Sequence, residues 1–127
     1  MTLKNEMYTI VGRSASPLGS SKNASDTVQL RLNADHPIYR AHFPGNPITP
    51  GVCLVKIVSE VVGQQLGCPL QLRRIANLKF ISVISPVETP LLDLHYQVDG
   101  VSPYRVKGTF SHDGQVYTKF SLELSEP

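Results

Sequence analysis

The sequence predicts an α+β fold in which an antiparallel sheet wraps around one long central helix. Segments with alternating apolar and polar residues occupy both ends of the chain, one long apolar segment lies between them, and turn signals separate the segments. Packing a long apolar helix against the apolar face of an antiparallel sheet buries both surfaces together. We expect residues 1–127 to form a single domain of this kind.

The composition excludes several classes of protein. The 41% hydrophobic and 17% charged residues and the net charge of +2 are typical of a globular protein, and without a basic stripe or any Trp we expect no nucleic-acid partner. No segment approaches the roughly 20 apolar residues of a membrane span, so we expect no membrane association. Cys53 and Cys68 lack the spacing and the His neighbours of a metal site. We therefore expect a reduced, cytoplasmic protein without a bound metal.

Two strands and a long loop are predicted before the helix. Tyr8–Val11 and Thr27–Leu32 have strand patterns, and the polar segment 14–26 between them is loop-like. Asn33–Pro50 follows, and its HPIYRAHFPGNPITPG run holds four prolines and two glycines. This composition predicts a stiff irregular loop, and long loops within compact domains are usually functional.

Val52–Leu66 is predicted to be the central helix although its many Val and Ile residues favour strands. Thr49 is a suitable capping residue, Pro50 suits the first helical position, and Gly67 is a stop signal. The spacing of the polar residues favours a helix, because at 3.6 residues per turn they fall on one narrow face of an otherwise apolar helix. They are Lys56, Ser59, Glu60 and Gln64.

Four strands are predicted after the helix, each with alternating polarity. Turn signals separate them, and the Asp113-Gly114 pair is a strong signal for a two-residue hairpin. The predicted strands are Leu72–Ile84, Leu91–Val98, Tyr104–Ser111 and Gln115–Leu124. With the central helix they predict a hotdog fold.

The loop and the start of the helix together form a candidate chemical site. At a helix start the amides of Gly51 and Val52 lack intrahelical partners and can hold a carbonyl oxygen, and Gly51 permits close approach. His42 on the preceding loop can remove a proton from the carbon next to a thioester carbonyl. A lone loop histidine is nevertheless more often a structural hydrogen-bonding group.

The run His42–Val52, HFPGNPITPGV, resembles the HFPG-x-P-x-x-PGV signature of the beta-hydroxyacyl-acyl-carrier-protein dehydratases. Ala76–Phe80 and Ile84–Val87 resemble that family's strand after the helix more loosely. The resemblance implies a hotdog-fold dehydratase of fatty-acid or related acyl-chain biosynthesis. It implies no metal or organic cofactor, a substrate that arrives as a thioester of acyl carrier protein or coenzyme A, and a homodimer or larger assembly with sites shared between subunits.

The resemblance also assigns roles to residues of this chain. His42 corresponds to the family's catalytic histidine, and the Gly51 amide to the group that holds the thioester carbonyl. The remaining residues of the motif that would contact substrate are Phe43, Gly45, Pro50 and Val52.

The chain departs from the family at residue 56, where a catalytic carboxylate supplied by the partner subunit is expected and Lys56 is found. An ammonium group donates a proton but does not accept one. Three interpretations stay open. In the first, Lys56 is the acid that protonates the departing hydroxyl. In the second, Glu60, one helical turn further on, replaces the missing carboxylate, although it could instead form an ion pair with Lys56. In the third, the chain is a non-catalytic acyl-binding or accessory subunit. A nucleophilic Cys53 would instead give an acyl thioesterase.

Overall fold

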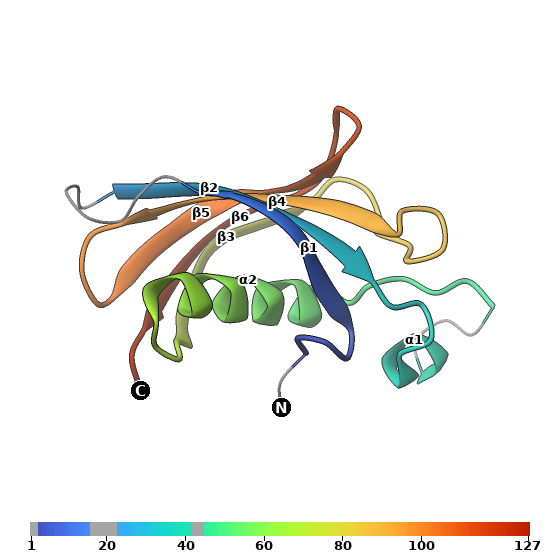
Figure 1. Ribbon diagram of the computed structural model, residues 1–127, viewed down its shortest axis with the longest axis horizontal. Coiled ribbons are helices and arrows are strands. Elements are labelled where there is room, and N and C mark those ends of the chain that lie inside the picture. Colours follow the sequence, from blue (N-terminus) through green and yellow to red (C-terminus); the bar gives the residue numbers. More distant parts are fainter. Residues whose placement is uncertain (1–2, 16–22, 42–44) are drawn as a thin grey trace.

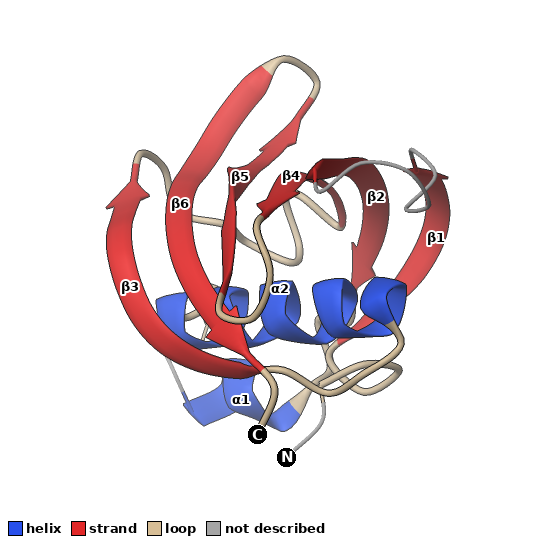
Figure 2. Ribbon diagram, turned by 90° about the vertical axis from the view of Figure 1, so that its left-hand side faces the viewer, coloured by secondary structure: helices blue, strands red, loops and turns tan. Residues whose placement is uncertain are grey.

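The computed structural model describes residues 3–15, 23–41 and 45–127. A six-stranded antiparallel sheet with the order β1-β2-β4-β5-β6-β3 curves around one long helix, α2 (Figures 1 and 2). The elements in chain order are β1 (Tyr8–Ala15), β2 (Asn23–Leu32), α1 (Pro37–Ala41), α2 (Gly51–Leu66), β3 (Gln71–Phe80), β4 (Leu91–Asp99), β5 (Tyr104–His112) and β6 (Gln115–Ser125). The predicted α+β hotdog fold is confirmed.

Helix α2 is nearly surrounded by the core, as the sequence predicts. It ends where Gly67 takes a left-handed conformation, φ 78°, and donates its N–H to the Gly63 carbonyl. Its apolar faces pack under the concave side of the sheet, against inward-facing residues such as Leu92, Leu94 and Leu122 that alternate along the strands. No helix in the described part of the chain is long and apolar enough to cross a membrane.

The predicted hairpin between β5 and β6 is confirmed. Asp113 and Gly114 both have positive φ values, 50° and 81°, as a two-residue turn that continues the strand twist requires. Strand β3 is shorter than predicted, since it ends at Phe80. Beyond it the chain leaves the sheet, and the Ile84 carbonyl accepts a hydrogen bond of 2.8 Å from Thr49 N–H. That bond fastens the post-strand segment to the approach to α2.

The segment predicted as an irregular loop contains a short helix, α1, so that prediction is wrong over five residues. Pro37 occupies the first helical position, where its missing N–H costs nothing. The Ile38 N–H donates to His36 Nδ1 at 3.2 Å, so His36 satisfies a helix-start amide. The structure thus gives His36 a structural role.

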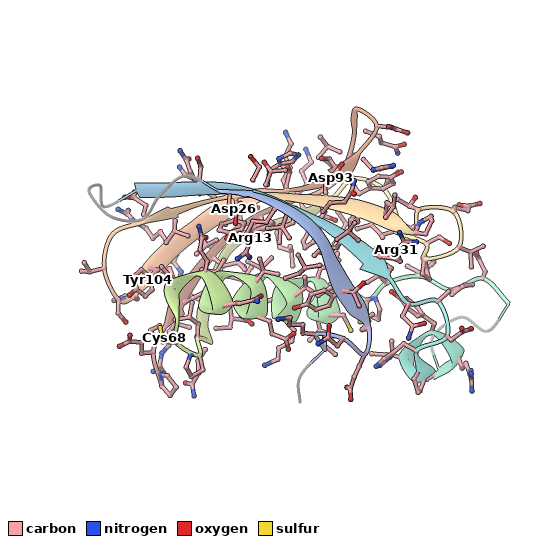
Figure 3. All side chains as sticks on the ribbon, in the orientation of Figure 1. Arg13, Asp26, Arg31, Cys68, Asp93 and Tyr104 are labelled. Carbon is pink, nitrogen blue, oxygen red and sulfur yellow. The ribbon has the colours of Figure 1, made fainter. Side chains whose placement is uncertain are left out.

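An ion pair between a buried carboxylate and a partly exposed arginine joins the N-terminal strands on the side of the sheet that faces α2 (Figure 3). Asp26 has a side chain with no exposed surface, and its Oδ2 lies 3.0 Å from Arg13 Nε. Tyr96 on β4 donates its hydroxyl to the same oxygen at 2.9 Å and also contacts Gln65 at the end of α2. Burial first, and then the Asp26 charge, raise the pKa of Tyr96. These contacts fix β1, β2 and β4 to the C-terminal end of the helix.

Candidate active site

The start of α2 presents backbone donors that have no acceptor in the described part of the chain. Pro50 precedes the helix with an extended backbone, and its carbonyl accepts from Cys53 N–H and Leu54 N–H. Among the described residues, no acceptor bonds the amides of Gly51 or Val52. These two N–H groups and the positive end of the helix dipole can stabilise negative charge on a carbonyl oxygen.

Thr49 does not cap α2, which corrects the sequence prediction. No described side chain caps the helix start, and the Thr49 hydroxyl instead forms a 2.9 Å hydrogen bond with the buried Tyr39 hydroxyl of α1. Burial raises the pKa of Tyr39 to about 12, so this phenol stays neutral. The hydrogen bond between Tyr39 and Thr49 connects α1 to the segment just before α2, and so helps to fix the position of the Gly51 amide.

A cavity of about 210 Å³ opens beside the free amides. Gly51 and Leu54 of α2 form one wall, and Phe80 at the end of β3 and Ile84 form another. The Phe80 ring lies so close to Gly51 that a Cβ atom there would come within 2.4 Å of Cζ. A mostly apolar pocket with a few polar groups at its mouth suits an acyl chain whose carbonyl lies at the helix start.

The predicted site residues are only partly brought together. His42 and Phe43 lie outside the described residues. Pro50 and Gly51 line the cavity, whereas Val52 is 75% exposed and is not among the residues that line it. Gly45 is exposed with a φ of 87°, a conformation that favours glycine.

Lys56 lies on a different face of α2 from the cavity. The predicted polar stripe lines a separate groove of about 440 Å³, into which Lys4 from the N-terminal segment also faces. Among the described residues, no carboxylate lies within ion-pair distance of the Lys56 nitrogen. Lys56 is half-buried, so its ammonium group is available to a group that enters the groove.

Glu60 anchors the N-terminal segment under the helix. Its carboxylate accepts from Leu3 N–H at 2.8 Å, Lys4 N–H at 2.9 Å and the Tyr8 hydroxyl at 2.9 Å. Burial, reinforced by the Glu60 charge, raises the pKa of Tyr8. Both carboxylate oxygens are occupied, and neither pairs with Lys56.

The cysteines lack the features of a nucleophile. Cys53 is 3% exposed, and burial raises its pKa, which keeps it a thiol. Burial also raises the pKa of Cys68, with Glu126 adding to the effect. Within the described ranges, no three His, Cys, Asp or Glu side chains gather in a way that could hold a metal ion.

Sequence reasoning missed Phe80 and Thr118 as cavity residues. The two are cross-strand partners of β3 and β6, and both line the cavity. The signals in the sequence were the strand patterns and, for Phe80, the loose resemblance of Ala76–Phe80 to the family's strand; neither reveals the register that aligns these strands.

Known proteins that are similar in sequence to this chain are dehydratases. Residues 19–119 match the ApeI-like family, described as ApeI dehydratase. The 3-hydroxyacyl-[acyl-carrier-protein] dehydratase FabZ of Rickettsia conorii is 25% identical over 116 residues, 82% of this chain and 79% of that protein. The FabZ of Wolbachia pipientis wMel is 29% identical over 80 residues, 58% of this chain and 56% of that protein, so this match spans little more than half of the relative.

A solved structure shares the fold. The dehydratase heterocomplex ApeI:P from Xenorhabdus doucetiae contains a chain that superposes with a TM-score of 0.66 at 19% identity, covering 92% of this chain and 96% of that one. The family match extends over most of the chain, from residue 19 into β6. The chain therefore belongs to the ApeI-like dehydratase family.

Proposed function

We propose that this chain removes water from a 3-hydroxyacyl thioester, carried by acyl carrier protein or coenzyme A, to give a trans-2-enoyl thioester. The observation that carries the proposal is that the amides of Gly51 and Val52 have no acceptor among the described residues, and that Gly51, near the end of the motif beginning HFPG, lines a largely apolar cavity. Such donors stabilise the enolate oxygen that forms when the C2 proton leaves. A cytoplasmic location remains a prediction from the sequence.

In this mechanism the C2–H bond breaks and its proton passes to the imidazole of His42. The electron pair forms the C2=C3 bond while the C3–O bond breaks. The departing oxygen takes a proton from the Lys56 ammonium group of a second subunit and leaves as water. Exchange with solvent then removes the proton from His42 and returns one to Lys56.

A dimer is part of the proposal because Lys56 and the cavity occupy different faces of α2 within one chain. Strand β3 is an edge strand, and nine of its ten residues are exposed, with the tenth half-buried. Leu72, Ile75 and Phe80 are 42%, 46% and 56% exposed along it. Unpaired strand edges with apolar side chains favour pairing with another strand. We propose that two copies pair along β3 and that each supplies Lys56 to the other's site.

A second candidate, a non-catalytic acyl-binding or accessory subunit, rests on Lys56 and Glu60 together. Lys56 stands where the resemblance places a carboxylate, and Glu60 is engaged with the N-terminal segment. Among the described residues that line the groove around Lys56, no carboxylate other than Glu60 is present to act as the family's catalytic group. An acyl thioesterase finds less support, since Cys53 is buried and protonated.

The test is incubation of the purified chain with a 3-hydroxyacyl thioester of acyl carrier protein, followed by mass spectrometry. Enoyl product that disappears in His42→Ala and falls at least tenfold in Lys56→Ala supports the dehydratase with Lys56 as acid. No product from the wild type, but product from Lys56→Glu, supports the accessory role with a silenced site. Free thiol without enoyl product would identify a thioesterase and contradict both.

A further inference from the structure

The Thr118 hydroxyl is a buried polar group without a partner on the wall of the cavity. Thr118 lies on β6, is 1% exposed, and its Oγ1 finds no hydrogen-bond partner among the described residues. Other buried threonines are satisfied: Thr49 pairs with Tyr39, and Thr89 with Tyr117. An unsatisfied buried hydroxyl destabilises a fold, and valine of nearly the same shape would avoid this cost.

The position of Thr118 places its side chain near the proposed acyl carbonyl. In the sheet register Thr118 is the direct partner of Phe80, whose ring lies over Gly51. Side chains of direct cross-strand partners are on the same face of a sheet, about 5 Å apart at Cβ. A ligand whose carbonyl bonds the Gly51 amide therefore extends past Phe80 toward the Thr118 hydroxyl.

A trapped water is a poor partner for this hydroxyl. A buried water needs two to four polar partners, and few polar side-chain groups face this cavity: the Thr49 hydroxyl bonds the Tyr39 hydroxyl, and the Ser82 hydroxyl accepts from Gln115. The remaining wall is largely apolar, with Ile48, Leu54 and Ile84. At about 30 Å³ for each water-sized group, the cavity of about 210 Å³ holds about seven such groups. It is large enough for a short acyl segment.

We infer that Thr118 is a specificity-determining residue whose hydroxyl bonds a hydroxyl group of the bound acyl chain. The inference rests on the proposed function, because it takes the cavity to be the acyl site. Two hydroxyls share this chemistry: the 3-hydroxyl of the substrate, and a second hydroxyl nearer the end of the chain. In either case the cavity prefers a hydroxylated acyl group to an alkyl group of equal length, because only the former satisfies Thr118.

The experiment measures binding rather than turnover. Isothermal titration compares three pantetheine amides of equal chain length, in which the amide replaces the thioester so that no elimination follows: a plain alkanoyl amide, a 3-hydroxy amide and a terminally hydroxylated amide. We expect the wild type to bind one hydroxylated amide about fivefold to tenfold more tightly than the alkanoyl amide. Thr118→Val should abolish this preference without lowering the melting temperature.

Thr89→Val is the matched control, since it makes the same change at a buried threonine outside the cavity. It should keep the ligand preference and lower the melting temperature, because it breaks the bond to Tyr117. A preference that is absent in the wild type or survives in Thr118→Val overturns the inference, as does a melting temperature that falls in Thr118→Val as it does in the control. Binding of the alkanoyl amide without preference leaves the acyl site intact, whereas no binding by any of the three overturns the acyl site as well.

Discussion

The ring of Phe80 lies so close to Gly51 that a Cβ atom at this position would force the ring to move. An added Cβ would lie 2.4 Å from Cζ and 3.0 Å from Cε1 of the ring. The first residue of α2 and the last residue of β3 therefore approach each other closely, and both line the cavity. Because glycine has no Cβ, it leaves room at this position for the Phe80 ring and for the close approach of a ligand carbonyl.

Replacing Gly51 by alanine should impair the site more than the fold. The atom that the new Cβ meets is the far end of a side chain that is 56% exposed, so the ring can turn away at a cost of about 1 kcal/mol. The displaced ring and the added methyl should lower kcat/KM for the 3-hydroxyacyl thioester at least tenfold. Urea unfolding and steady-state kinetics measure the two effects separately.

Gly12→Ala is the control for this substitution, because a Cβ on Gly12 meets no atom within 4 Å. It should leave both kinetics and stability unchanged. Full activity in Gly51→Ala would contradict a role for the start of α2 in holding the thioester carbonyl.

Glu60 should prove structural rather than catalytic. Glu60→Ala removes the acceptor for Leu3 N–H, Lys4 N–H and the Tyr8 hydroxyl, and hydrogen bonds to charged groups contribute about 1.5–3 kcal/mol each. Because the site is partly exposed and water replaces some of these bonds, we expect a loss of about 3 kcal/mol in the free energy of unfolding. Urea unfolding measures the loss, and limited proteolysis should show faster cleavage near residue 4.

Gln64→Ala, one turn further along the same stripe, is exposed and should leave stability unchanged. If Glu60→Ala instead keeps wild-type stability but loses turnover, the carboxylate acts in catalysis, and the interpretation in which it replaces the missing family carboxylate is supported.

Three buried tyrosines should make the fold unstable at alkaline pH. Burial is the largest cause of the raised pKa of Tyr8, Tyr39 and Tyr96, and Glu60 and Asp26 add to it for the first and last. Their ordinary pKa is 10.0, so the stabilisation is complete below pH 10 and is lost as pH rises toward the folded-state values. Each tyrosine then removes up to about 1.4 kcal/mol per pH unit, because only the unfolded chain releases its proton readily.

Urea midpoints between pH 8 and pH 11.5 measure this loss, and phenolate absorbance in the native protein should show these three phenols still protonated at pH 11. Tyr39→Phe should make the decline above pH 10 shallower. A midpoint that stays constant to pH 11.5 would be incompatible with neutral buried phenols.

The sequence predicts the parts of the fold that depend on local signals. The polar stripe and Gly67 mark α2, and Asp113-Gly114 marks the β5–β6 turn, because each pattern lies within a few residues of the structure that it specifies. Helix α1 was missed although Pro37 is a start signal, since its five residues are too few to show a helical period.

Contacts between distant residues were not predictable in the same way. Glu60 and Leu3 are 57 residues apart, and the bond between them depends on how β1 and the segment before it pass under α2. The register of β3 against β6, which brings Thr118 beside Phe80, depends on two irregular positions in that pairing. The sequence therefore predicted the free amides of α2 but not the cavity next to them.

The edge of β3 should be the dimer interface, and a charge placed there should separate the subunits. Ile75 is 46% exposed midway along this edge strand. In a dimer with two-fold symmetry, Ile75→Arg places one positive charge from each subunit close together at the interface, and the two repel each other. We expect multi-angle light scattering to show the wild type at twice the 14.0 kDa of one chain and the variant at 14.0 kDa. Val101→Arg, at a 72% exposed residue between β4 and β5, should remain dimeric. The proposed shared site predicts that the monomeric variant also loses turnover, because each cavity would then lack the Lys56 of the other subunit; a monomer with full activity would refute the shared site.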